Sequence, residues 1–224
     1  MGDEPAWRTT WQNTVQCEDD LVRFVNDVGC CTIGPLERWP NFPSQGVAMG
    51  LRDVLGTTWF WKDDLHTEKR LFYTRLFAGR PGFISYAMLP VFIASSGEVA
   101  DELVHYGKLP ATTCEILRVI EEHGPIATRK LKKLLGSDAC RAANAALIDL
   151  ERRFIVTKTD IAGRTLGTYS YIWDLAERWI PDAFVAADRI KRKAAREQVM
   201  SHLTSHSIDP NPTFLTRVLR WTEL

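Results

Sequence analysis

The stretch that decides the fold covers residues 124–160 and reads GPIATRKLKKLLGSDACRAANAALIDLERRFIVTKTD. Its first part predicts a short helix over residues 129–135. Thr128 is placed to cap that helix, because a threonine oxygen accepts hydrogen bonds from free amides at a helix start. Gly136 is placed to close it, since glycine readily ends a helix. A compact helical element at this point is therefore expected.

The second part of the stretch predicts a longer helix and then a strand. Ser137 and Asp138 are placed to cap a helix that runs to Arg153. Residues 154–159 are β-branched and alternate in polarity, which is typical of a strand. After a turn, residues 168–173 favour a return strand. The end of the stretch thus predicts a β-hairpin.

Outward from this stretch, one more helix is predicted on its N-terminal side. Residues 111–123 carry Ile116, Leu117 and Ile120 at helical spacing and end before a Gly-Pro pair. Three helices followed by a hairpin is the order of a winged helix-turn-helix. We therefore predict a mainly α-helical α+β fold with small β-hairpins, containing a winged helix-turn-helix and organised as tandem winged-helix-like modules.

The remaining sequence predicts further helices and three domains. The segments predicted outside residues 124–160 are helices over 19–28, 45–55, 63–77 and 98–106, a brief strand over 83–85, and an amphipathic basic helix over 182–203. Residues 86–94 are predicted to form either an apolar helix or a buried segment interrupted at Pro90. The predicted domains are a mostly helical, winged-helix-like domain over 1–108, the winged helix-turn-helix over 109–181, and a basic helix with a tail over 182–224.

Composition is that of an ordinary globular protein. The chain has 224 residues, with 28 basic and 28 acidic side chains and 45% hydrophobic residues. Eight tryptophans and ten phenylalanines exclude disorder along the whole chain. No window is apolar enough for a membrane span, and the acidic start Met1-Gly2-Asp3-Glu4-Pro5 differs from a signal peptide. We expect a cytoplasmic protein whose five cysteines are reduced thiols.

Local charge points to a polyanion-binding region. Residues 129–153 hold seven basic and three acidic side chains, whereas residues 1–27 hold two basic and six acidic ones. In a helix-turn-helix the third helix enters the major groove, where Arg141 can pair with guanine and Asn144 with adenine. The flanking basic side chains neutralise phosphates in this interpretation, and Arg164 marks the tip of the wing. The candidate DNA-binding residues are Arg129, Lys130, Lys132, Lys133, Arg141, Asn144, Arg152, Arg153, Lys158 and Arg164.

Each feature also has a plainer interpretation. The alanine-rich third helix fits a degenerate winged helix that packs against protein, and the basic run over 189–196 fits a solvated helix face. His202 and His206 are four residues apart, but the Glu of a His-Glu-x-x-His zinc motif is missing. We expect no metal and no cofactor. Double-stranded DNA is the expected partner, and binding to a membrane is not expected. The sequence gives no information on the oligomeric state.

The sequence resembles one known family in several short segments. They are Val28-Gly29-Cys30-Cys31 with the proline-rich loop behind it, Trp59-x-Trp61-Lys62-Asp63, Phe83-Ile84-Ser85 with Leu89-Pro90, Gly124 to Leu131, Ala145-Ala146-Leu147-x-Asp149-Leu150-Glu151, and Phe154 to Lys158. Over roughly residues 20–181 the chain resembles winged-helix proteins related to the bacterial interstrand-crosslink repair DNA glycosylases, the AlkZ/YcaQ-like family. The resemblance implies stacked winged-helix modules and excision of alkylated bases.

The chain departs from that family at its catalytic motif. The resemblance implies a Gln-x-Asp or Gln-x-Gln motif after a helix-terminal glycine, where this chain has Thr32 in the Gln position and Gly34 in the Asp position. Neither side chain can act as a general base. We therefore predict a DNA-binding relative without the catalytic motif, which recognises damaged or distorted duplex. One alternative is a divergent glycosylase that uses Asp63 or Asp64, and a second is a protein-interaction winged helix.

Overall fold

The computed structural model describes residues 15–36, 39–41, 57–165, 167–206, 208 and 211–221. The chain forms two compact units. Unit 1 combines Met1–Ser96 with Ala186–Leu224, and unit 2 is the continuous segment Gly97–Val185 between them. The mainly helical α+β class predicted from the sequence is confirmed, since helices dominate both units and each holds one small sheet. The predicted domains 1–108, 109–181 and 182–224 stay a prediction.

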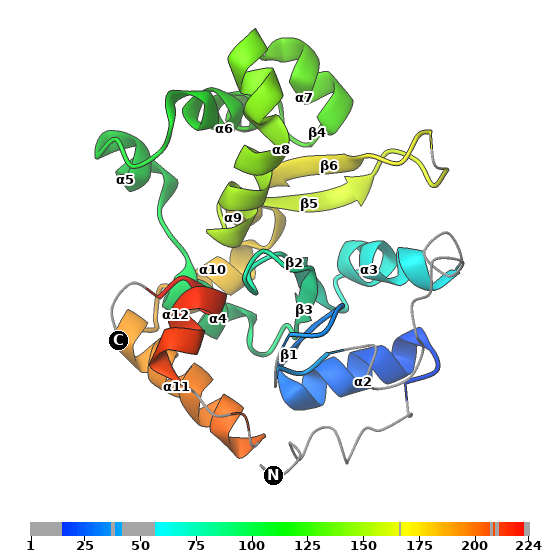
Figure 1. Cartoon of the computed structure of the whole chain (residues 1–224), viewed down its shortest axis with the longest axis vertical. Helices are drawn as coiled ribbons and strands as arrows, with labels where there is room; N and C mark the ends of the chain where they lie inside the picture. The colour runs from blue at the N-terminus through cyan, green and yellow to red at the C-terminus, as the bar shows by residue number, and fades with distance from the viewer. Residues whose placement is uncertain are drawn as a thin grey trace. The chain divides into compact units, whose positions relative to one another are not determined.

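Unit 2 contains residues 124–160, the stretch with which the sequence analysis began (Figure 1). Its elements are α5 (Ala100–His105), α6 (Ala111–His123), β4 (Ile126–Ala127), α7 (Thr128–Leu134), α8 (Ser137–Arg152), β5 (Val156–Ile161), β6 (Tyr171–Leu175) and α9 (Ala176–Trp179), and α10 (Pro181–Ala187) follows. The strands form an antiparallel sheet in the order β4-β6-β5. Three helices followed by a hairpin is the order predicted above.

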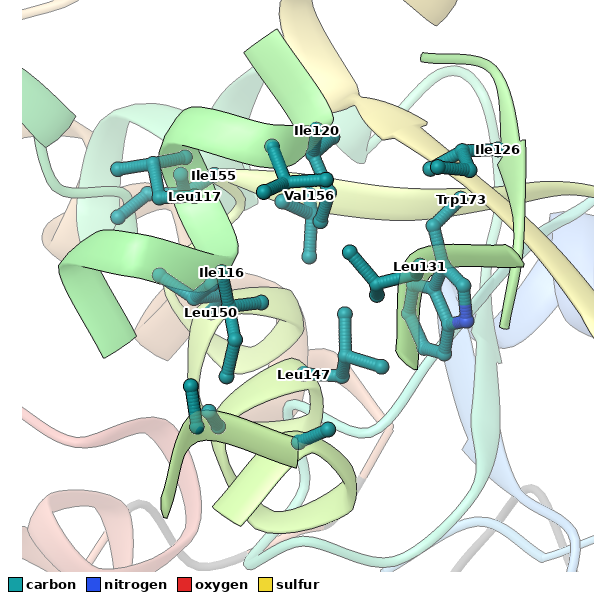
Figure 2. Packing of buried hydrophobic residues seen from close by; sticks show 14 of the residues in the cluster. Ile116, Leu117, Ile120, Ile126, Leu131, Leu147, Leu150, Ile155, Val156 and Trp173 are labelled. Atoms are coloured by element: carbon teal, nitrogen blue, oxygen red, sulfur yellow. The ribbon is translucent and has the colours of Figure 1, made fainter. Parts of the chain in front are cut away.

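The core of unit 2 lies between its helices and its sheet (Figure 2). Ile116 and Ile120 of α6, Leu147 of α8 and Leu131 of α7 point toward one another, and the Trp173 ring lies beside Leu131. All of these side chains are buried. Burying a large aliphatic side chain stabilises a fold by about 1.5–3 kcal/mol. Unit 2 thus has a hydrophobic core of its own.

Both predicted helix caps in this unit are wrong. Thr128 is the first residue of α7, Ala127 occupies the cap position, and no side chain caps the helix. Likewise, Ser137 and Asp138 are the first two residues of α8 and do not precede it. Gly136 occupies the cap position, and no side chain caps this helix. The hydroxyl of Thr128 instead bonds to β6, as described below, so it is not available to the first turn of its own helix.

The junction from α8 to β5 is closed by a residue other than glycine. Phe154 has a positive φ of 58°. Its amide donates to Glu151 O at 3.1 Å, and the Ile155 amide donates to Leu150 O at 3.0 Å. This pair of bonds is the Schellman motif, in which a residue in the left-handed region satisfies the last free carbonyls of a helix. The buried Phe154 side chain anchors the turn that leads into the hairpin.

Unit 1 is built from both ends of the chain. Its elements are α2 (Glu18–Val28), β1 (Cys30–Thr32), α3 (Thr57–Thr67), β2 (Phe72–Thr74), β3 (Gly82–Ile84), α4 (Leu89–Ser96), α11 (Arg192–Ser205) and α12 (Pro212–Leu219). The antiparallel sheet has the order β1-β3-β2. Helix α11 packs on α4, and the amide of Ala78 donates to Val218 O at 2.9 Å. The C-terminal segment therefore belongs to the same core as the N-terminal one.

Two predicted helices are corrected, and one cannot be placed. The helix predicted over 63–77 is wrong, because α3 ends at Thr67 and residues 72–74 form a strand. The single helix predicted over 182–203 is wrong, since α10 ends at Ala187 and α11 begins at Arg192. The helix predicted over 45–55 lies outside the described residues.

Candidate nucleic-acid interface

Helix α7 presents a compact group of positive charges. In its sequence TRKLKKL only Leu131 is buried, since it points into the core of unit 2. Arg129, Lys130 and Lys133 are exposed, Lys132 is half-buried, and the helix holds no acidic residue. Four cations within seven residues create a local positive potential that attracts a polyanion. We call these four side chains the α7 basic group.

Helix α8 divides its small residues between the core and the surface. Ala139, Ala143 and Ala146 are buried, and α8 packs closely on α6 along this side. Part of the alanine content thus serves helix packing, because small side chains allow two helices to approach. Arg141 and Asn144 are exposed. The Arg141 guanidinium is bonded to the Asp138 carboxylate in the first turn of the same helix.

Three other predicted DNA-contact residues lie at the end of α8 and on β5. Arg153 is only 14% exposed, and its guanidinium binds Glu98 and Asp149, both at 2.8 Å. Lys158 is buried, and its Nζ lies 2.6 Å from Glu151 Oε1. Both cations are neutralised within unit 2, so we leave them out of the interface. Arg152 is half-buried.

The β5–β6 hairpin is joined to the start of α7. The Thr128 hydroxyl donates to Tyr171 O at 2.9 Å and accepts from Trp173 Nε1 at 2.9 Å. The Arg129 guanidinium donates to Gly167 O in the hairpin loop. Arg164, in the same loop, is exposed. Sequence reasoning missed the role of Thr128, because a threonine before a helix is most simply interpreted as a cap.

Comparison with known proteins identifies a family. A family model described as AlkZ related matches residues 15–220 of the chain. The chain belongs to the AlkZ-related family. This confirms the resemblance noted from the sequence and relates the chain to glycosylase-like DNA repair proteins. No curated protein and no solved structure matches it.

The two residues that the resemblance places at the family's catalytic motif, Thr32 and Gly34, lie on β1 and directly behind it. Thr32 is fully buried, and its hydroxyl donates to Pro40 O at 3.3 Å. Gly34 follows β1 and carries no functional group. A threonine hydroxyl is far too weak a base to activate water, and a glycine has no side chain that could do so.

The predicted carboxylates of unit 1 lie on α3. Asp63 is buried, and its Oδ2 lies 2.6 Å from Lys62 Nζ. Burial lowers the pKa of Lys62, while the charge of Asp63 and the hydrogen bond to it oppose that shift. Asp64 is half-buried. Burial first, and then the charge of Asp64, raise the pKa of Glu18. Asp63 is therefore buried and paired with a cation, whereas Asp64 is half-buried.

Among the residues that the structure describes, histidine and cysteine side chains form no recognisable metal centre. The ring centroids of His202 on α11 and of His206, directly after this helix, lie 4.8 Å apart. Burial and then His202 lower the pKa of His206, while Asp27 opposes the shift. Within the described ranges, no three His, Cys, Asp or Glu side chains are grouped as metal ligands. Burial raises the pKa of the Cys30 and Cys31 thiols, which disfavours reactive thiolates.

Of the helices in the described part of the chain, none is both long and apolar enough to span a bilayer.

Proposed function

We propose that this AlkZ-related protein binds double-stranded DNA through unit 2, acting as a winged helix-turn-helix. Helix α8 enters the major groove with Arg141 and Asn144, and the α7 basic group and Arg164 contact phosphates. The observation that carries the proposal is the α7 basic group, which is free of acidic neighbours in its own helix and precedes an exposed helix face.

The proposed ligand is damaged or distorted duplex. Family membership supports this choice, because it relates the chain to DNA repair proteins. The buried Thr32 and the absence of a side chain at Gly34 support a binding role without the family's catalytic motif. In this proposal the protein binds a deformed site in the duplex and does not excise a base from it.

Fluorescence anisotropy of labelled duplex across a salt series tests the proposal. Phosphate contacts make the logarithm of affinity fall linearly with the logarithm of salt, by about 0.9 per phosphate. We expect K130E/K133E to weaken binding at least about tenfold and to reduce the slope by about 2. A duplex with one mismatch or abasic analogue should bind several times more tightly than the intact duplex.

The matched control is K191E/K193E, which makes the same charge change at two exposed lysines of unit 1. This control should keep the affinity and slope of the original chain. Equal losses in both variants would mean that the α7 basic group is not the interface. No binding at low salt would reject the DNA proposal and favour the protein-interaction alternative, for which the exposed Val99, Val104 and Tyr106 offer an apolar surface.

A divergent glycosylase is the second candidate, and the buried Lys62–Asp63 pair favours it. A carboxylate 4% exposed and held by an ammonium group is a costly arrangement, and such arrangements are concentrated at functional sites. Release of alkylated base from duplex, detected as alkali-labile abasic sites, tests this candidate. D63N should abolish release and D64N should retain it. Absence of release by the original chain rejects the candidate.

A further inference from the structure

The first residues of α7 make two separate connections to the hairpin. Thr128 uses both its proton and its oxygen on β6, donating to Tyr171 O and accepting from Trp173 Nε1, each at 2.9 Å. Arg129, the next residue, reaches the hairpin loop at Gly167. Strand β4 adds the pairs Ile126↔Trp173 and Ala127↔Ile172 directly before them. Four consecutive residues, 126–129, thus hold the hairpin.

The hairpin is also stiffened along its own length. Tyr171 and Trp173 alternate along β6, so their rings share one face, and the ring of Tyr169, just before the strand, contacts that of Tyr171. The Tyr169 hydroxyl donates to the Tyr171 hydroxyl at 2.9 Å, and the ring centroids of Tyr171 and Trp173 lie 5.8 Å apart. Lys158 Nζ lies 4.7 Å from the Tyr171 ring centroid and 5.2 Å from that of Trp173. The hydrogen bonds of Thr128 to β6 therefore also restrain Tyr169, through the contacts between the three rings.

The loop of the hairpin is organised in the same way. The Ala162 amide donates to Ser170 O at 2.7 Å, and the Thr165 and Thr168 hydroxyls lie 2.7 Å apart. Gly163 passes so close to Thr168 that a Cβ there would meet its Oγ1 at 2.3 Å. The segment that carries Arg164 thus has a defined shape.

From these contacts we propose that Thr128 and Arg129 are positioning residues. They clasp the hairpin to the start of α7, so that Arg164 and the three lysines of the α7 basic group keep a fixed spacing on the DNA. This inference rests on the proposed function. It assigns Arg129 a different role from the other cations of its helix, because its guanidinium holds the hairpin loop at Gly167.

The substitution T128V tests the clasp without a change of charge. It keeps the side-chain shape but removes both hydrogen bonds, whereas T128S keeps the hydroxyl. We expect amide hydrogens of residues 162–170 to exchange faster in T128V and normally in T128S. At a temperature where circular dichroism shows both variants folded, the salt slope should fall by about 1 in T128V only, as one phosphate contact is lost.

A double-mutant cycle makes the test specific for positioning. R164Q should weaken DNA binding severalfold in the original chain and have little further effect in T128V, because the hairpin is already displaced. A purely structural role for Thr128 would leave the two effects additive. If T128V does not fold, W173F provides a second test. It removes the indole donor to Thr128 together with part of a buried ring, and it should shift hydrogen exchange and salt slope in the same direction.

The outcomes separate the two proposals. Normal hydrogen exchange at residues 162–170 in folded T128V overturns the clasp, whatever the DNA result. Additive effects of T128V and R164Q overturn the positioning role. Faster exchange in T128V together with no DNA binding by the original chain leaves the clasp standing and rejects the proposed function.

Discussion

At the residue scale, the charge that α8 offers to DNA depends on an aspartate as well as on an arginine. Asp138 and Arg141 are both exposed and bonded to each other. An exposed pair of this kind adds little stability, about 0–1 kcal/mol. Its carboxylate nevertheless places a negative charge beside Arg141, on the helix that enters the major groove in the proposed complex and therefore lies close to the DNA phosphates. Asp138 therefore opposes binding while Arg141 favours it.

D138N should tighten DNA binding. The substitution removes the negative charge and releases the Arg141 guanidinium, so we expect affinity to rise about two- to tenfold and the salt slope to steepen by about 1. Stability should fall by up to about 1 kcal/mol, because a carboxylate in the first turn favours a helix. Anisotropy across a salt series measures both binding quantities. The control D188N removes an exposed carboxylate from unit 1. Equal gains in both variants would contradict a specific effect at α8.

At the scale of elements, periodicity predicted the helices of unit 2 well. Helix α6 begins and ends at the predicted residues 111 and 123, and α7 and α8 differ from prediction by one residue at the ends. Each of these helices has one buried face and one exposed face, which gives a clear pattern. The family was also predictable, because its short segments are spread over much of the chain.

Periodicity failed where a segment is buried on every side. The sequence predicts a helix for Leu71, Phe72, Leu76 and Phe77. All four are buried, but Phe72 lies in β2, Leu71 directly before that strand, and Leu76 and Phe77 in the turn behind it. A fully buried segment has no polar face, so a helix and a strand leave the same apolar pattern. Lys69 begins the change of direction with a positive φ of 56°. No glycine or proline in the sequence signals this break.

The candidate site was predicted from the helix-turn-helix order and from local charge, and neither shows where neutralising partners lie. Lys158 follows Glu151 by seven residues, and Arg153 pairs with Glu98, far away in sequence. Both pairings depend on the turn from α8 into β5 and on the docking of the segment before α5. Lys130 and Lys133 face outward because Leu131 fills the core position of the same helix.

The pair Glu151–Lys158 gives a prediction for the contact between α8 and β5. K158M would leave the Glu151 carboxylate buried without its cation, and we expect a loss of about 3–5 kcal/mol of unfolding free energy. The double variant E151Q/K158M should recover much of this loss. Glu151 Oε2 has no hydrogen-bond partner among the described residues, so the pair is incompletely satisfied and can be replaced. Urea unfolding measures both variants. Equal losses would mean that the pair itself is strongly stabilising.

At the scale of the whole molecule, unit 1 depends on the last described residues of the chain. Trp221 is fully buried, and its Nε1 donates to Ser96 Oγ at 2.8 Å. The Arg196 guanidinium lies 5.3 Å from the Trp221 ring centroid. Ser96 is the last residue before unit 2, whereas Trp221 lies beyond it in the sequence. Unit 1 can therefore complete its core only after unit 2 has been synthesised.

W221A should destabilise unit 1 and spare the core of unit 2. Removing a buried Trp typically costs about 3–5 kcal/mol, and here the Ser96 hydroxyl also loses its donor. Amides of α4 and α11 should lose protection from hydrogen exchange, while those of α6 and α8 keep it, because unit 2 has a core of its own. The reciprocal variant L147A, in the unit 2 core, should cost about 2–5 kcal/mol and reverse the pattern. Loss of protection in both units from either substitution would show that the two cores unfold as one, and the DNA-binding surface would then depend on Trp221 as much as on Leu147.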